Sequence, residues 1–518
     1  MIPRPAPAVP APMPAPMSAG GQARPGFHAG FPARRAGPEV LPLGPALAHA
    51  LAWQAVGLGL LVLHVLLVRE TGPAAAVLAL GGLALLYALL PLAGLVVFWQ
   101  MALYQNAAVA FFSDGMSPGA YQVLLGTGFL AAGLLGGLAT LRILFARPAA
   151  APAARRIALL ACAAIGVSTA YAAYGATLSS PASAAVYLRA ATGMLLMLLV
   201  GLDLGRLWGF RAVAIGYLVS LLAGLCYSAL EVADPAWFYE AAGNLPFMNL
   251  KYGPAEQDWP FHTARDLIAT RTSVLFNVTG SETSLMSFRF GGPNIHPVSY
   301  AYVIAMGGIA ALGLRWRWSI VPVALLLAAI GVKGAMLAFV STLGFWALWQ
   351  WTGWPRLMLA GMAAFVVAYA TAVILVGLGS GDFHVIGLIG GFEGFLRNPL
   401  GHGIGVGGNL SDAARAGIDM AELQNSGAEF GLESAIGVLL YQLGLGLLAH
   451  FVAFGALLAA ARPRNGWRHA RPRDTDAIFI GAAMTMVNGL FQEEAYTTYA
   501  LGAALLFAGT LVANRPER

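Results

Sequence analysis

Residues 46–68 read ALAHALAWQAVGLGLLVLHVLLV and contain no Asp, Glu, Lys or Arg. A helix needs about 20 apolar residues to cross the ~30 Å hydrocarbon layer of a bilayer. Because lipid offers the backbone no hydrogen-bond partner, a run of this kind predicts a membrane-spanning helix rather than an extended segment.

Similar runs follow along the whole chain. The predicted spans are 46–68, 74–90, 92–112, 121–145, 156–178, 187–206, 210–229, 297–314, 318–331, 334–351, 355–378, 434–461, 476–490 and 495–513. Hydrophobic residues make up 58% of the chain and charged residues 10%, against about 25% charged in soluble domains. The predicted fold class is therefore an all-α polytopic integral membrane protein with about 14 transmembrane helices. Only Pro91 separates the second run from the third, so one kinked span is an alternative there.

The arginines predict the orientation. If the N-terminal arginines are cytoplasmic, the dense basic segments all fall on the cytoplasmic side. They contain Arg142, Arg147, Arg155, Arg156, Arg206, Arg211, Arg315, Arg317, Arg356, Arg462, Arg464, Arg468, Arg471, Arg473, Arg515 and Arg518. The pattern predicts fourteen spans with both ends cytoplasmic. It also accounts for the net charge of +6 without a nucleic-acid partner.

The chain then divides into six segments. Residues 1–45 are rich in Pro and Ala and predict a disordered cytoplasmic tail. Residues 46–229 hold the N-terminal spans, 230–296 a long outer loop, 297–378 the central spans, 379–433 a second long outer loop and 434–513 the C-terminal spans. The two outer loops have room for chemistry or recognition.

The first outer loop mixes aromatic and charged side chains. Its carboxylates and arginines include Glu231 and Arg271, and with the aromatic rings they are typical of sugar binding, although an aromatic belt at the membrane surface is an alternative. Arg289 lies just before the span at 297 and could bind an anionic lipid head group such as a pyrophosphate, or extend to the interface as many arginines do. His296, before Pro297, predicts a helix start.

Lys333 is one of only two lysines, with Lys251. It lies in the turn Gly331-Val332-Lys333-Gly334 between two predicted spans, on the outer side. A cation among apolar helices is costly without a partner, which favours a functional role over simple exposure at the interface.

The second outer loop predicts a short amphipathic helix on the membrane at 384–396, followed by a glycine-rich run from Gly401 to Gly408. We expect these glycines to let the backbone approach a membrane surface or a ligand. Glu433 precedes the next span, where it could cap the helix or act as a general base toward a sugar hydroxyl.

These pieces, in this order, resemble the bacterial O-antigen polymerase and ligase superfamily over roughly residues 280–510. Arg289 to Pro297 is similar to the family's Arg-x-x-Gly segment, and Val332-Lys333-Gly334 stands where the family often has Ser-Arg-Gly. Asn398-Pro399-Leu400-Gly401-His402-Gly403 is similar to its Asn-Pro-Leu-x-Gly-x-Gly stretch.

The family's ligases carry a His-Asn pair ten residues before a Gly-Leu-x-Gly turn. At that spacing this chain has Glu433-Ser434 before Gly444, and Gln424-Asn425 is a second candidate with different spacing. The missing histidine favours a polymerase over a ligase.

The resemblance implies polymerisation of undecaprenyl-pyrophosphate-linked repeat units into exopolysaccharide or O-antigen, at the periplasmic face of the bacterial inner membrane. A glycan ligase and a transporter of lipid-linked oligosaccharides are the alternatives. In the polymerase, Glu433 and His402 would be catalytic, and Arg289, Lys333 and Arg397 would bind the pyrophosphate. No cofactor or metal is expected. The expected partners are the lipid-linked substrate, the membrane, and proteins that regulate chain length and export the polymer.

Overall fold

A computed structural model describes residues 42–145, 150–252, 262–274, 286–408, 433–461, 469 and 471–513. Most of the predicted tail at 1–45 and the Gln424-Asn425 pair lie outside these ranges. The first helix begins at Leu43, inside the segment that the sequence predicted to be disordered.

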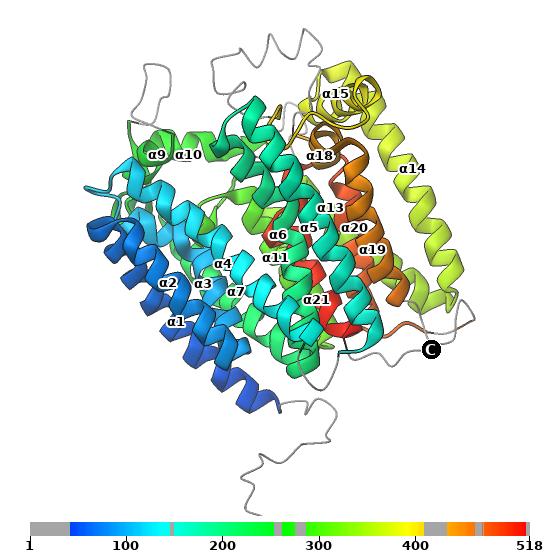
Figure 1. Ribbon diagram of the computed structural model, residues 1–518, viewed down its shortest axis with the longest axis horizontal. Coiled ribbons are helices and arrows are strands. Elements are labelled where there is room, and N and C mark those ends of the chain that lie inside the picture. The colour runs from blue at the N-terminus through cyan, green and yellow to red at the C-terminus, as the bar shows by residue number, and fades with distance from the viewer. Residues whose placement is uncertain are drawn as a thin grey trace, which may run out of the picture. The chain divides into compact units, whose positions relative to one another are not determined.

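The described residues form helices and one small two-stranded sheet (Figure 1). The helices of the first half are α1 (Leu43–Thr71), α2 (Pro73–Leu89), α3 (Pro91–Phe111), α4 (Pro118–Phe145), α5 (Pro152–Leu178), α6 (Pro181–Leu207), α7 (Gly209–Ala233), α8 (Pro235–Ala241), α9 (Asn244–Tyr252) and α10 (Ala264–Arg271). The sheet consists of β1 (Thr272–Val274) and β2 (Met286–Phe288), which pair antiparallel.

The second half continues with η2 (Gly292–Asn294), α11 (Pro297–Gly313), η3 (Arg317–Ser319), α12 (Ile320–Ile330), α13 (Lys333–Thr352), α14 (Pro355–Ser380) and α15 (Phe383–Arg397). The last elements are α18 (Ala435–Leu443), η4 (Gly444–Leu447), α19 (Leu448–Ala460), α20 (Asp476–Asn488), η5 (Glu493–Tyr496), η6 (Thr498–Gly502) and α21 (Ala503–Val512).

Every predicted apolar run coincides with one helix or with two or three consecutive helical segments. Within the described ranges, eight helices are long and apolar enough to cross a membrane, judged by length and composition. Five further apolar helices are shorter, with 10–17 residues. The chain is therefore an all-α membrane protein.

The Pro91 region is a turn between two helices and not a kink. The backbone of Gly94 in α3 lies against that of Tyr87 in α2, and a Cβ on Gly94 would come 2.7 Å from the Tyr87 Cα. In one continuous helix these seven residues would rise by about 10 Å. The chain therefore reverses direction at Leu90.

Helices α6 and α21 form the centre of the assembly (Figure 1). Most of α6 from Ala191 onward is buried. Gly201 and Gly205 lie directly against the backbone of α21 at Leu506 and Thr510. Small residues that let backbones approach are typical of helix packing in membranes, where dispersion contacts replace the hydrophobic effect as the driving force.

This close approach predicts different outcomes for two glycines. Gly201→Leu is expected to lower the free energy of unfolding by about 1–3 kcal/mol or more, because its side chain would overlap the Leu506 carbonyl. Gly166→Leu in α5 is the control, since a Cβ there meets nothing within 4 Å. Thermal unfolding in detergent compares the two variants, and equal melting temperatures would contradict the packing described here.

Candidate functional site

Both long predicted outer loops contribute helices to the same end of the assembly. In Figure 1, α9 and α10 of the first loop and α15 of the second lie at this end. The helix ends at this end include the C-terminal end of α7, which contacts α8, the turn between α12 and α13, where α12 contacts β2, and the N-terminal end of α18 beside η5. We call this end the outer end.

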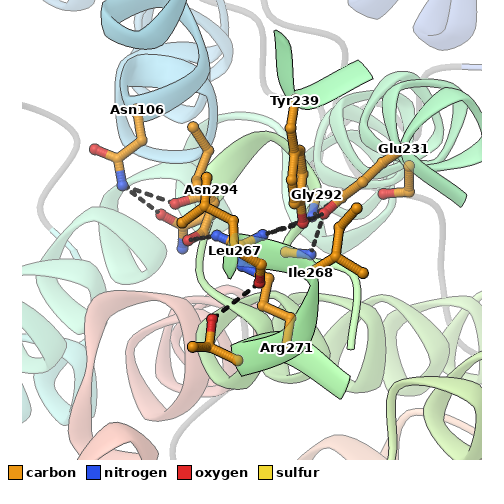
Figure 2. Close-up of polar contacts among 12 residues, drawn as sticks. Asn106, Glu231, Tyr239, Leu267, Ile268, Arg271, Gly292 and Asn294 are labelled. Carbon is orange, nitrogen blue, oxygen red and sulfur yellow. Dashed lines mark hydrogen bonds and ion pairs between the residues drawn. The ribbon is translucent and has the colours of Figure 1, made fainter. Parts of the chain in front are cut away.

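A buried ion pair fixes the first loop (Figure 2). Glu231, at the end of α7, is 1% exposed and Arg271, at the end of α10, is 9% exposed. The Arg271 Nη1 donates to Glu231 Oε1 at 3.2 Å, and the Tyr239 hydroxyl donates to the same oxygen at 2.8 Å. The backbone N–H groups of Gly291 and Gly292 also donate to this carboxylate, at 2.9 and 2.8 Å. We call these five residues the loop lock.

The loop lock also positions the chain that enters α11. Arg271 Nη2 donates to the Ile295 carbonyl at 3.1 Å, and the side chain of Asn106 donates to the Asn294 carbonyl at 2.7 Å. The sequence assigned the carboxylates and arginines of this loop to sugar binding. For Glu231 and Arg271 the structure shows instead that they bind each other and hold the loop on α7.

His296 is the N-cap residue of α11, which confirms the predicted helix start. Its Nδ1 accepts a hydrogen bond from the Ser299 N–H at 3.3 Å. Burial lowers the pKa of His296 from 6.5 to about 4, with a further contribution from the positive charges of Lys251 and Arg271.

The low pKa of His296 predicts an acid-sensitive helix start. Because the unfolded chain binds the proton more tightly than the folded one, stability is full above pH 6.5 and falls as the pH drops toward 4. Between pH 7 and pH 5 we expect a loss of about 1–2 kcal/mol, discounted because the ring keeps some contact with solvent. His296→Asn, which can still cap α11, should flatten this pH dependence of the melting temperature; an unchanged slope would contradict it.

Arg289 follows strand β2, which connects the loop lock to the α12–α13 turn. The Arg289 N–H donates to the Arg271 carbonyl at 2.9 Å, and the Ser287 hydroxyl donates to the Ala329 carbonyl of α12 at 2.5 Å. Desolvation lowers the pKa of Arg289. The strand thus carries Arg289 to the part of the outer end where Lys333 begins α13.

Lys333 is exposed at the first residue of α13. The next residue, Gly334, lies against the end of α20, where its carbonyl accepts from Asn488 Nδ2 at 2.9 Å. Tyr302 of α11 joins the same contact, because its hydroxyl donates to Gln492 Oε1 at 2.9 Å. These buried polar contacts hold the Lys333 turn beside the segment that follows α20.

Glu433 contacts that segment through its backbone carbonyl, and its side chain lies beside His384. The Glu433 Oε2 lies 3.6 Å from His384 Nδ1, and the two side chains are 36% and 34% exposed. The same His384 nitrogen is 3.1 Å from the Glu433 carbonyl, which also accepts from the Glu493 N–H at 3.0 Å. The pair is therefore open to a substrate while its backbone is fixed.

The backbone of Glu433 is unusual, with φ of 41°. A non-glycine residue in the left-handed region carries a cost of order 1–3 kcal/mol and is often found at functional sites. Ser434, and not Glu433, caps α18: its hydroxyl accepts from the Gly437 N–H at 2.9 Å and donates to the Leu490 carbonyl at 2.7 Å. The carboxylate of Glu433 is thus not needed to cap the helix.

Glu494 is the third titratable group in this cluster. Burial raises the pKa of Glu494, the negative charge of Glu433 raises it further, and His384 opposes the rise. Two carboxyl groups and an imidazole lying close together are candidates for acid–base catalysis. We call His384, Glu433 and Glu494 the carboxylate cluster.

Arg397 and His402 do not join this cluster. Helix α15 separates His384 at its start from the exposed Arg397 at its end by about 20 Å. His402 lies at the opposite end of α18 from Glu433, about 10 Å along the axis, where its ring stacks on Tyr441 with centroids 4.0 Å apart. The predicted catalytic pair of Glu433 and His402 is thus divided between two places.

The glycine run after Arg397 packs against protein, contrary to the expectation of a membrane surface or a ligand. Gly403 lies against Gly175 of α5, Gly405 against Ala184 of α6, and Gly401 against the end of α18. All three have positive φ, which only glycine adopts without strain.

The sequence patterns did not predict His384 or Glu494 as site residues. In the sequence, Glu494 directly precedes the predicted span 495–513, and His384 is the first residue of the predicted helix 384–396. That helix is confirmed as α15. Both positions are on the predicted outer side, which was the available signal, but the contact of His384 with Glu433 depends on how α15 packs on α18.

Comparison of the chain with models of protein families, with curated proteins and with solved structures finds no match.

Proposed function

We propose that the chain polymerises undecaprenyl-pyrophosphate-linked oligosaccharide repeat units at the outer face of a bacterial inner membrane. The observation that carries the proposal is the carboxylate cluster, which lies at the end of the helices beside the Lys333 turn. A general base with cations nearby suits the transfer of a glycan from a pyrophosphate to a hydroxyl group.

Glu433 is the base in this proposal. An acceptor hydroxyl oxygen attacks the anomeric carbon of the donor glycan, and the bond from that carbon to the pyrophosphate oxygen breaks. The hydroxyl proton passes to Glu433, while His384 orients the carboxylate. Lys333 and Arg289 bind the leaving pyrophosphate and stabilise its charge. Arg397 and His402 have no role in this step, because they lie away from Glu433.

Fourteen crossings with both chain ends in the cytoplasm belong to the same proposal. Contacts between helix ends support it. Arg142 at the end of α4 and Tyr87 at the end of α2 both contact Asp203 near the end of α6, at 2.7 and 3.0 Å. Arg317 after α11 pairs with Asp474 before α20 at 2.7 Å. Each contact joins ends that the alternation of spans assigns to the cytoplasmic side.

A glycan size profile tests the function. A strain that lacks the gene should accumulate single repeat units on lipid, and normal long polymer would overturn the proposal. Accumulation of long lipid-linked polymer would indicate a ligase instead. Complementation with Arg289→Ala or Glu433→Ala should fail, while Arg265→Ala, an exposed arginine on α10, should restore the polymer. Full rescue by both of the first two variants would refute the assigned site.

A further inference from the structure

A basic and aromatic pocket lies at the end of α13 opposite Lys333. It is a shallow hollow, open on one side, and is lined by Arg317, Trp346, Ala347, Gln350, Trp351 and Arg471. Helix α13 separates its Trp351 from Lys333 by about 27 Å. The pocket is therefore distinct from the carboxylate cluster and plays no part in the chemistry proposed there.

The walls of the pocket are held in place by specific contacts. The Arg317 guanidinium lies 5.1 Å from the centre of the Trp346 ring, and its Nη2 is 2.7 Å from Asp474 Oδ1. Trp346 Nε1 donates to the Arg473 carbonyl at 3.3 Å, and Gln350 Nε2 donates to the Pro472 carbonyl at 3.0 Å. The segment 471–474 is thus fixed on α13, and Arg317 is positioned before any ligand binds.

Arg317 still faces solvent despite its ion pair. Its side chain is 59% exposed, whereas Asp474 is 8% exposed. A guanidinium has five N–H donors in a planar fork, so the bond to Asp474 leaves donors for a second anion. Arg471 is exposed and adds the second positive charge of the pocket.

Tryptophans place the pocket at the level of lipid head groups. Trp318, Trp351 and Trp354 are 72%, 86% and 52% exposed, and all lie near the same helix ends as the pocket. Tryptophan is enriched at the boundary between membrane and water, where its ring contacts the acyl region and its N–H contacts the head groups. An exposed Trp351 in the pocket wall therefore faces lipid.

We propose that this pocket binds the phosphate group of an anionic phospholipid. Arginine forks match the geometry of phosphate oxygens. Basic pockets between transmembrane helices on the cytoplasmic side are typical sites for anionic head groups. The arginines provide the charge recognition, and Trp351 contacts the glycerol and the start of the acyl chains. Bound lipid adds a bridge between Arg317 on the α11–α12 turn and Arg471 before α20.

Thermal unfolding of the purified protein in a neutral detergent tests this site. Phosphatidylglycerol should raise the melting temperature in a saturable way, as a ligand that binds only the folded state does, and phosphatidylcholine should not. Arg471→Gln should weaken the apparent affinity about tenfold, the effect of losing one charge-assisted hydrogen bond. The control is Arg356→Gln, which replaces an exposed arginine at the same end but outside the pocket. Its apparent affinity for phosphatidylglycerol should stay within about twofold of the wild-type value.

A second variant, Arg317→Lys, and a comparison with inorganic phosphate complete the test. Arg317→Lys keeps a cation beside Asp474, so it should fold, but it loses the fork and should also weaken the effect of phosphatidylglycerol. Equal stabilisation by phosphatidylcholine, or equal affinities in Arg471→Gln and Arg356→Gln, would overturn the proposal. Protection by inorganic phosphate at the same concentration as the lipid would also overturn it, because the site would then bind free phosphate.

Discussion

Replacing Arg271 by Met is expected to lower the free energy of unfolding by about 3–5 kcal/mol, the range found when one partner of a buried ion pair is removed. Glu231 is 1% exposed and would keep a charge with no cation beside it. Three neutral donors, from Tyr239, Gly291 and Gly292, would remain. The melting temperature of the purified protein in detergent measures the loss.

The matched control is Arg265→Met, which removes an exposed arginine from the same helix. A double variant that combines Glu231→Gln with Arg271→Met should regain part of the stability, because no buried charge is then unpaired. If Arg271→Met and Arg265→Met have the same melting temperature, Glu231 does not depend on Arg271, and the ion pair does not hold the first loop.

In the proposed polymerase, replacing Glu433 by Gln should reduce polymer formation about 10²- to 10⁴-fold, the usual contribution of a general base. The substitution keeps the size of the side chain and removes its ability to accept a proton. The left-handed backbone and the Glu433 carbonyl contacts stay available, so the folded state should be retained. The rate of polymer synthesis in membranes from a complemented deletion strain measures the effect.

Glu240→Gln is the matched control, since Glu240 is an exposed carboxylate in α8 at the same end of the assembly. Glu240→Gln should leave the rate of polymer synthesis within about twofold of the wild-type rate. His384→Ala should reduce the rate less than Glu433→Gln, because His384 orients the base and does not take the proton. Wild-type polymer from Glu433→Gln would exclude Glu433 as the base, even if other evidence supported a polymerase.

The hydrophobic runs predicted the helices well because a membrane imposes one length and one kind of structure on them. They could not predict where a helix breaks for a tertiary reason. The run 434–461 looked continuous, yet Gly444 has φ of 52° and ends α18. Gly444 lies against the backbone of Pro399 and Gly401 from the second loop, and this contact is invisible in the local pattern.

The candidate site was predicted only in part for the same reason. Glu433 and Lys333 are conspicuous because each is a charge at the edge of an apolar run. His384 reaches Glu433 only because one face of α15 consists of Gly387, Gly391 and neighbouring small residues that pack directly on Gly437 of α18. Contacts of this kind depend on how helices distant in the sequence pack together. The local hydrophobic pattern of a single sequence does not show them.

The central pairing of α6 with α21 also bears on biosynthesis. Helix α6 ends at Leu207 and α21 ends at Val512, so about 300 residues are made between them. At a synthesis rate of about 5–20 residues per second, at least about 15 seconds pass between the completion of α6 and the completion of α21. In that interval Gly201 and Gly205 lack the α21 backbone that covers them in the folded protein. A truncated chain without α21 would keep that surface uncovered, and quality control could distinguish it from the finished protein.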